Sequence, residues 1–416
     1  MKKKLLLVCG LVLIAGLLFA GGGQEEGTAG EGLGGEITLW YFEYEINSQE
    51  DMEFIANRYM ELNPDVKVVL ESPPIDQYHD RLITAVGAGE APDLAMNATA
   101  WMTELAEAGV IFDWETQVPA AFIDTFVQNM LETGRFKGKL YGLPYLATSR
   151  GMFINDTIYS KAGVKPAKTW EEFVPAAKAT TNAAEEYYGL ALQGAGVENF
   201  AAWFLYFFWS FGGEIFDGQG NLTINSAAGV KALTYMGDLV NKHKVTQPNV
   251  TATDLPEQLN LFKAGNAGST ITGPWLIGIL ASDAPDLEYS VVPIPAGEQQ
   301  ITLGVTDSLV FFKDSDNPEV AKDFAQHFLS PEMQTRWVSG RGMIPIIQES
   351  SKDPIFTGNE KLKVFLEMLP SARFAPLDPR WTRIMEEGGK ALQSVYLGQA
   401  NPKDALDKAV DNVNRM

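Results

Sequence analysis

Short apolar segments alternate with amphipathic ones in the first hundred residues, and this alternation limits the fold more than any other feature. The β-type run EITLWYF begins at Glu36, VKVVLE begins at Val66, and DLAM begins at Asp93. Between the first two runs, Phe54 and Tyr59 belong to a pattern with three- and four-residue spacing, which predicts a helix. Strands that alternate with helices indicate βαβ units, and therefore a parallel sheet with helices on both faces.

The same rhythm returns in the second half of the chain. YGLALQG, STITG, YSVVPIP and GVTDSLVFF are predicted strands, and helices are predicted to start at Pro318 and Pro331. The tail from Trp381 onward is expected to be mostly helical, and FDGQGNLTIN is predicted to form a small hairpin. Ligands of such sheets bind beyond the carboxyl ends of the strands, so residues that follow strands are candidate ligand contacts.

An aromatic run, FAAWFLYFFWSF, places eight aromatic rings between Phe200 and Phe211. A membrane anchor, a core helix and a platform on which a ligand stacks would each explain it. The run is too short to span a bilayer, and a helix that is apolar on all sides is a buried one. We therefore predict a core helix that stops at Gly212, with Trp203 and its neighbour Phe200 near the helix start as the rings able to meet a ligand.

The N-terminus has the layout of a secretory signal. MKKK is followed by the apolar run LLLVCGLVLIAGLLF and by the small residue Ala20. Residues 1–20 are expected to be a cleavable signal peptide, with an uncleaved anchor as the alternative, and the glycine-rich residues 21–35 a flexible linker. A periplasmic or other extracytoplasmic location follows from this expectation.

Composition argues against several classes of partner and cofactor. The chain carries 32 basic and 53 acidic residues, a net charge of -21, which disfavours nucleic acid and anionic membranes. Its one cysteine, Cys9, lies in the apolar segment of the expected signal, so no disulfide or thiolate site is expected. The histidines His79, His243 and His327 lack metal-ligand spacing, and no metal or cofactor is expected.

Catalytic signatures of good specificity are missing from the sequence. There is no GxSxG elbow, no phosphate-binding GxxxxGK[ST], and no GxGxxG that follows a strand. Adjacent acids such as Glu171 and Glu172 diverge by about 100° on a helix and more commonly form solvated faces. No catalytic residue is assigned, and an enzyme is not expected; a secreted glycosidase remains the alternative.

Tryptophans gather after predicted strands or near predicted helix starts. An indole presents a broad apolar face and one N–H donor, which suits the C–H faces of a sugar ring. Core packing explains most tryptophans, but several at loop positions favour a shared cleft. These residues are Trp40, Trp101, Trp203, Trp275 and Trp381.

A family resemblance rests on segments that occur in order along the chain from about Glu36 onward. They are ITLWYF, NPDVKVV, GEAPDLAM, KGKLYGLPYLATSRGMFIN, KAGVKPAKTWEEF, FGGEIFDGQGNLTIN, ITGPW, and NPEVAKDFAQHFLSPEMQTRW with GMIP. With these segments the chain resembles an extracellular solute-binding protein of a bacterial ABC importer, from the carbohydrate-binding group that includes maltose-binding proteins.

The resemblance implies an α/β, two-lobed fold of the type II periplasmic-binding-protein kind, with the lobes joined by a hinge and the ligand cleft between them. By analogy, the N-terminal lobe would be discontinuous, with residues 36–146 and 305–355. The C-terminal lobe would hold residues 147–304 and 356–416. In such proteins the ligand is enclosed by hinge closure, and the membrane permease recognises the closed form.

The resemblance also implies the ligand site. Trp275 of TGPW matches a tryptophan that stacks on sugar in relatives, Arg150 can serve two hydroxyls, and Asp307 is a hydroxyl acceptor. Arg341 and Arg373 could equally be lobe-bridging or surface residues. With Trp203 from the aromatic run, the expected ligand-binding residues are Trp40, Glu43, Tyr44, Asn97, Thr99, Tyr145, Thr148, Arg150, Trp203, Trp275, Asp307, Arg341, Arg373 and Trp381.

The expected function is high-affinity capture of a mono- or oligosaccharide outside the cytoplasm and its delivery to the permease subunits of an ABC importer, by a monomer. Phe42, Tyr44 and Glu45 stand where maltose-binding proteins tend to have small polar or basic residues, which argues against maltose itself. A binder of glycerol phosphate, a polyol, a peptide or another small solute is the alternative. Phosphate would require convergent arginines or a helix N-terminus, and Arg150, Arg341 and Arg373 keep this alternative open.

Overall fold

The computed structural model describes residues 33–43, 48–196 and 200–415. The expected signal peptide, most of the expected linker and Tyr44 lie outside the described residues. The first strand begins at Gly35, one residue before the expected onset of order.

The first sheet contains the predicted βαβ units. Among the described residues it has six strands, in the order β11-β10-β3-β1-β2 with β6 paired to β10. β1 is parallel to β2 and to β3, whereas β10 runs antiparallel to β3 and β6. The strands are β1 (Gly35–Trp40), β2 (Val66–Glu71), β3 (Leu94–Ala98), β6 (Leu143–Thr148), β10 (Thr302–Phe311) and β11 (Ala372–Phe374).

Helices pack on this sheet as the sequence pattern predicts. α1 (Ser48–Leu62) contacts β2, and α12 (Pro318–Phe328) contacts β1. The buried residues of α1 include Met52, Ile55 and Tyr59, which recur at three- and four-residue spacing. The remaining helices of this half are α2 (Ile75–Ala88), α3 (Met102–Ala108), α4 (Ala120–Ile123), α5 (Gln128–Leu131) and α13 (Pro331–Ser339), and a two-strand ribbon is formed by β4 (Arg135–Phe136) and β5 (Lys139–Leu140).

The second sheet has the order β8-β7-β9, and here the expectation of a parallel sheet was wrong. β7 (Gly151–Asn155) runs antiparallel to β8 (Ser269–Thr272) and to β9 (Tyr289–Val292). β8, α11 (Trp275–Asp283) and β9 do follow one another as strand, helix and strand. However, β7, which comes much earlier in the sequence, lies between the two strands. The predicted strand YGLALQG takes part only through isolated parallel bridges, such as Ala191 with Thr270.

β7 is buried on both faces, as expected of a strand with core on either side. Phe153 lies near the rings of Phe262 and Phe365 on one face. Met152 and Ile154 belong to the other apolar cluster, together with the aromatic run. This sheet therefore separates two layers of apolar side chains.

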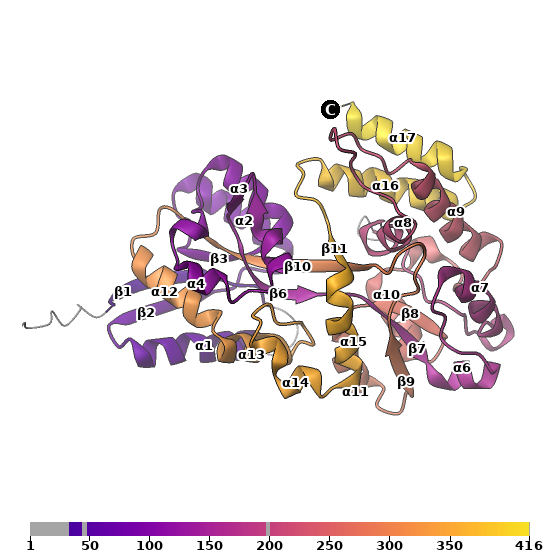
Figure 1. The fold of residues 1–416 in the computed structure, drawn as a ribbon, viewed down its shortest axis with the longest axis horizontal. Helices are drawn as coiled ribbons and strands as arrows, with labels where there is room; N and C mark the ends of the chain where they lie inside the picture. The colour runs from indigo at the N-terminus through magenta and orange to yellow at the C-terminus, as the bar shows by residue number, and fades with distance from the viewer. Residues whose placement is uncertain (1–32, 44–47, 197–199, 416) are drawn as a thin grey trace, which may run out of the picture. The chain divides into compact units, whose positions relative to one another are not determined.

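β6 and β10 lie side by side and extend from the first sheet toward the second (Figure 1). Only Ser149 and Arg150 separate the end of β6 from the start of β7. The hydroxyl of Thr302, at the start of β10, accepts from the Arg150 amide at 2.8 Å and donates to the Arg150 carbonyl at 2.9 Å. These two hydrogen bonds hold the backbone of Arg150 against β10.

The helices that follow in the second half cover this sheet and pack on one another. α16 contacts α17 and α9, and Figure 1 shows α16 and α17 together near the C-terminus. The helices are α6 (Asp156–Ala162), α7 (Trp170–Ala179), α8 (Leu205–Ser210), α9 (Ala227–Asn241), α10 (Leu255–Lys263), α14 (Pro354–Thr357), α15 (Glu360–Met368), α16 (Trp381–Tyr396) and α17 (Pro402–Asn414).

The aromatic run forms one turn of π-helix, η5 (Phe200–Phe204), followed by α8. All of its rings are buried, as predicted for a core helix. Phe200, Phe204 and Phe208 stack in succession, with ring centroids 4.6 and 5.2 Å apart. The described part of the chain contains no helix with the length and apolar character that a membrane crossing requires.

Two helical glycines allow a matched test of packing. A Cβ on Gly229, in α9, would lie 1.8 Å from the Ile224 carbonyl oxygen, whereas a Cβ on Gly278, in α11, would have no neighbour within 4 Å. We expect Gly229→Ala to lower the free energy of unfolding by about 1–3 kcal/mol, because backbone must shift. Gly278→Ala should raise it by about 0.5–1 kcal/mol, because alanine favours the helix. Urea unfolding measures both, and equal effects of the two variants would contradict the packing.

Candidate functional site

Two cavities lie beside the β6–β10 strand pair and together hold six of the predicted site residues. The first has a volume of about 430 Å³ and is lined by the end of β3, by β10 and by the segment between β11 and α16. Thr99, Asp307 and Trp381 belong to its lining. Trp381 is nearly buried, and Asp307 is half-buried.

Threonine hydroxyls form a small network at the wall of the first cavity. The Thr99 hydroxyl donates to the Thr306 carbonyl at 2.6 Å. The Thr133 and Thr306 hydroxyls lie 2.7 Å apart, and Thr133 also donates to the Met130 carbonyl. Because these hydroxyls already have protein partners, this wall is rigid and offers a ligand few unused hydrogen-bonding groups.

The second cavity has a volume of about 410 Å³ and is lined by five separate segments, one of which contains Gln193, Ala195 and Gly196. Arg150 comes from the link between β6 and β7, Trp203 and Tyr206 from the aromatic run, Gln258 from α10, and Trp275 from the start of α11. It therefore combines large aromatic surfaces with polar groups, the composition typical of a small-molecule site.

Arg150 lies across the aromatic wall of the second cavity. Its guanidinium carbon is 4.7 Å from the centre of the Trp275 ring, a cation–π contact. Its Nη1 donates to the Thr148 hydroxyl at 2.9 Å and to the Ser149 carbonyl at 3.3 Å. Burial lowers the pKa of Arg150, an effect that the neighbouring Tyr206 hydroxyl opposes. The same burial raises the pKa of Tyr206 to about 12, so its hydroxyl is protonated at neutral pH.

The Trp275 ring lies against the backbone of Gly273. A Cβ at position 273 would come within 2.0 Å of the six-membered part of the indole. Only glycine leaves this space free. In the sequence TGPW, the position of the Trp275 ring therefore depends on glycine at position 273. Trp275 itself remains half-buried, with part of its surface facing the cavity.

Two nearly buried side chains in the second cavity keep a polar atom without a protein partner. Gln258 is 1% exposed; its amide nitrogen donates to the Thr270 hydroxyl and the Ile271 carbonyl, but its Oε1 has no donor. Thr272 is 2% exposed, and its hydroxyl also has no partner. A buried acceptor left unpaired costs about 1–3 kcal/mol. These are the unpartnered buried side-chain atoms of this cavity among the described residues.

Comparison with known proteins identifies the family. The family model described as bacterial extracellular solute-binding protein matches residues 45–335. The chain belongs to this family. A putative binding protein of Brucella abortus (strain 2308) is 31% identical over 382 residues, which cover 90% of this chain and 92% of that protein. The maltotriose-binding protein of Pyrococcus abyssi is 25% identical over 356 residues, which cover 83% of this chain and 74% of that protein.

Solved structures of solute-binding proteins share the whole fold. An ABC transporter solute-binding protein from Thermotoga lettingae, bound with alpha-D-tagatose, superposes with a TM-score of 0.78 at 26% identity. The match covers 91% of this chain and 99% of that one. The predicted fold class, a two-lobed α/β fold of the type II periplasmic-binding-protein kind, is confirmed.

Several predicted site residues of this solute-binding protein line neither cavity. Trp40 is half-buried and packs edge-on against Tyr78, with ring centres 6.0 Å apart. Glu43 is exposed, and Thr148 enters the site only as the acceptor of the Arg150 bond. Asn97 is fully buried, with its Oδ1 unpartnered, and does not belong to either lining.

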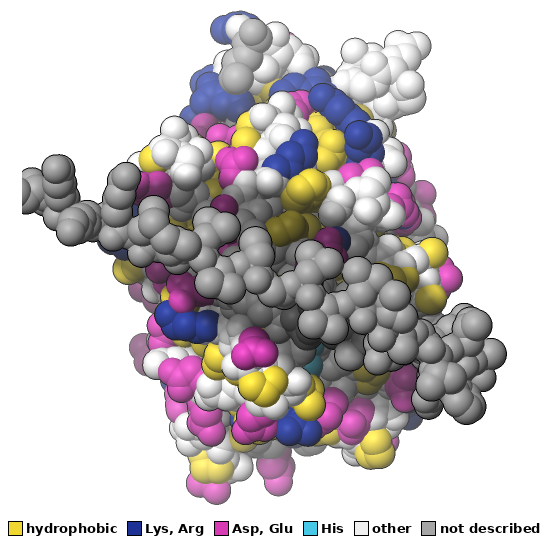
Figure 2. Space-filling model, turned by 90° about the vertical axis from the view of Figure 1, so that its left-hand side faces the viewer, with side chains coloured by type: hydrophobic (Ala, Val, Ile, Leu, Met, Phe, Trp, Pro, Cys, Tyr) yellow, Lys and Arg dark blue, Asp and Glu magenta, His cyan; other side chains and the backbone are white. Residues whose placement is uncertain are grey.

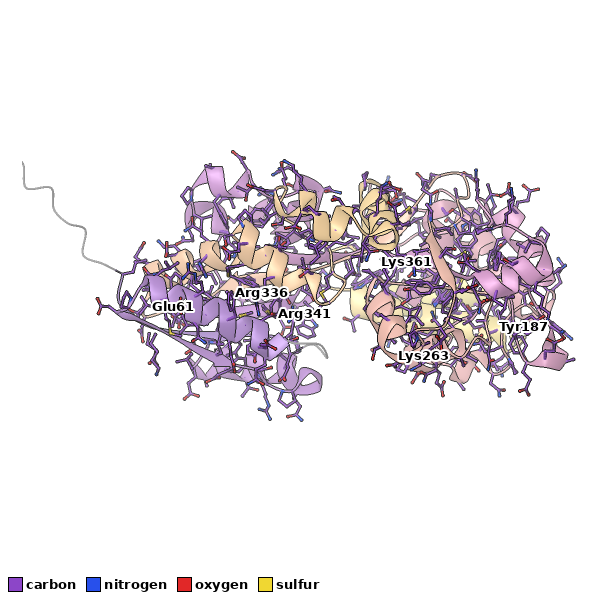
Figure 3. All side chains as sticks on the ribbon, turned by 90° about the horizontal axis from the view of Figure 1, so that it is seen from below. Glu61, Tyr187, Lys263, Arg336, Arg341 and Lys361 are labelled. Atoms are coloured by element: carbon purple, nitrogen blue, oxygen red, sulfur yellow. The ribbon has the colours of Figure 1, made fainter. Side chains whose placement is uncertain are left out.

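Tyr145 and Arg341 belong to the packing of the first half and not to the cavities. Tyr145 is fully buried near Phe328 and Trp337. Arg341 is 4% exposed and pairs with Asp51, with Nη2 and Oδ2 3.1 Å apart, because its buried charge needs a carboxylate. Figure 3 shows Arg341 close to Arg336, whose Nε lies 2.9 Å from the other Asp51 oxygen.

Arg373 also forms an ion pair with a side chain of the protein. Both of its terminal nitrogens contact the Glu214 carboxylate, and its guanidinium lies over the Trp209 ring at 5.2 Å. Arg341 and Arg373 thus each form an ion pair within the protein, and neither lines either cavity.

Trp203 lines the second cavity as predicted, but Phe200 does not. Phe200 packs on Gly388, where an added Cβ would lie 2.5 Å from its ring. Tyr206 joins Trp203 instead. The two residues are three positions apart, their ring centres lie 5.9 Å from each other, and both line the cavity. That spacing was the available signal. Gln258 and Thr272 had none, because burial without a partner is visible only in three dimensions.

Proposed function

We propose that this protein captures a carbohydrate outside the cytoplasm and delivers it to the permease of an ABC importer. The observation that carries the proposal is the second cavity. A half-buried Trp275 indole lies in the same cavity as the unpartnered Gln258 and Thr272 oxygens. A sugar ring matches this arrangement, because it has apolar C–H faces and hydroxyls around its rim.

The names of relatives support the same ligand class. The Pyrococcus abyssi relative is named a maltotriose-binding protein, and the Thermotoga lettingae structure holds a tagatose. From these relatives we infer only the class of the ligand, a carbohydrate, and not the particular sugar. The family consists of binding proteins, so we propose capture without turnover and expect no glycosidase activity.

We propose the β6–β10 pair and the segments beside it as the hinge. The lobes would then be residues 36–146 with 305–355, and residues 147–304 with 356–416, and they would close on the ligand for recognition by the permease.

We also propose that residues 1–20 direct export and that the protein acts as a monomer. On the face drawn in Figure 2, the described basic side chains lie mainly in the upper part and the acidic side chains mainly in the lower part.

A thermal-shift screen tests the proposal directly. The purified chain would be heated with mono-, di- and trisaccharides, and with glycerol 3-phosphate and a short peptide mixture as other solute classes. A ligand that binds only the folded state at 100 times its Kd stabilises it by about 2.7 kcal/mol, so a true ligand should raise the melting temperature clearly. Calorimetric titration and product analysis would then establish binding without hydrolysis. A shift with the other solutes but with no carbohydrate would refute the proposal.

A further inference from the structure

Arg150 differs from the other arginines that the sequence suggested for the site. Arg341 is paired with Asp51, and Arg373 with Glu214. Among the described residues, the partners of the Arg150 guanidinium are the Thr148 hydroxyl, the Ser149 carbonyl, Tyr206 and the Trp275 ring. Among the residues that the structure describes, no carboxylate forms an ion pair with Arg150.

A guanidinium that pairs with no carboxylate of the described residues is electrostatically incomplete. Removal of a charge from water costs several kcal/mol unless an opposite charge or several good hydrogen bonds replace the solvent. Asp254, the carboxylate among the described lining residues, is exposed and accepts from the Glu257 amide at 2.9 Å as the N-cap of α10. It does not neutralise Arg150.

The cavity also lacks donors for its buried acceptors. Gln258 Oε1 can only accept a hydrogen bond, and the Thr272 hydroxyl can donate or accept. A ligand that paired with all of these groups would therefore bring hydroxyl donors for Gln258 and Thr272 and a negatively charged hydrogen-bond acceptor for Arg150. Neutral sugars bring only the first of these, and simple inorganic anions bring only the second.

We infer that the ligand is an anionic carbohydrate, one that carries a carboxylate or a phosphate. This inference rests on the proposed function. The anionic group is bound by Arg150, and the sugar hydroxyls donate to Gln258 and Thr272. Trp275 offers the sugar ring the part of its surface that faces the cavity beside the Arg150 guanidinium. Charge-assisted hydrogen bonds are roughly twice as strong as neutral ones, which makes Arg150 the residue that selects the charged sugar.

Calorimetric titration with matched pairs tests the inference. The probes are D-galacturonate against D-galactose, D-glucuronate against D-glucose, and D-glucose 6-phosphate against D-glucose, and the uronates and the phosphate separate the two kinds of anion. We expect a charged member to bind roughly tenfold to hundredfold tighter than its neutral partner. Arg150→Gln should abolish this preference, and Arg150→Lys should keep part of it. Arg373→Gln is the matched control and should keep all of it, because Arg373 lies outside the second cavity.

The outcomes separate this inference from the proposed function. Neutral sugars that bind as tightly as their acids would overturn the inference and leave carbohydrate capture intact. Binding of inorganic phosphate or succinate, without binding of any sugar, would overturn both. Absence of binding by every probe would also count against both.

A measurement without ligand adds an independent check. Arg150→Met should raise the melting temperature of the unliganded protein by roughly 2 °C or more, because it removes a charge that no carboxylate of the described residues compensates. Arg373→Met, at a partly exposed pair, should change it little. A lower melting temperature for Arg150→Met would contradict an uncompensated charge.

Discussion

Phe207→Ala is expected to lower the free energy of unfolding by about 3–5 kcal/mol, the usual cost of a large cavity in an aromatic core. Phe207 is 0% exposed, and its ring centre lies 4.3 Å from that of Trp170 and 5.1 Å from that of Tyr235. Those neighbours come from α7 and α9, so the ring joins three helices. Truncation removes contacts that the two rigid rings cannot replace.

Urea unfolding followed by circular dichroism measures this loss. Phe54→Ala is the matched control, because Phe54 lies on α1 with 40% of its surface exposed. It should cost less than about 1 kcal/mol. Similar losses for the two variants would show that the aromatic run is not a rigid core.

Trp275→Ala is expected to weaken carbohydrate binding by roughly 30-fold to 100-fold, because the stacking face disappears while the polar groups remain. Trp275→Phe should keep part of the affinity, since a ring remains. Gly273→Ala should weaken binding in a similar way without any change to Trp275, because the new Cβ would occupy the space of the indole. Titration with the best ligand from the thermal-shift screen provides the measurement.

Trp101→Ala serves as the control for this series. Trp101 is also half-buried and follows a strand, but it lines neither cavity and lies near His79, with ring centres 4.8 Å apart. Its loss should leave affinity nearly unchanged. If Trp101→Ala weakened binding as much as Trp275→Ala, the second cavity would not be the ligand site.

Local sequence patterns predicted most of the helices and the strands on which they pack. α1, α12 and α13 lie where three- and four-residue spacing or a proline at the helix start predicted them. The burial of the aromatic run followed from its length and its lack of a polar face. Each of these features depends on residues within a few positions of one another, so the printed sequence contains the necessary information.

The order and direction of the strands in the second sheet could not be predicted from such local patterns. β7 pairs with β8 and β9, which lie more than a hundred residues later, and its apolar composition fits a parallel or an antiparallel neighbour equally well. The prediction of a parallel sheet failed here because strand pairing is a nonlocal choice.

The sequence by itself determined the family, the alternation of strands and helices, and a set of aromatic and polar residues suited to a sugar. Only the tertiary structure separated Arg150 from Arg341 and Arg373. The three side chains are chemically identical, and their partners Asp51 and Glu214 lie far from them in the sequence. Whether a charge is compensated depends on distances of a few ångströms between such remote residues. For this reason the residues of a site can be named from a sequence, while the charge that the site still needs can be read only from the fold.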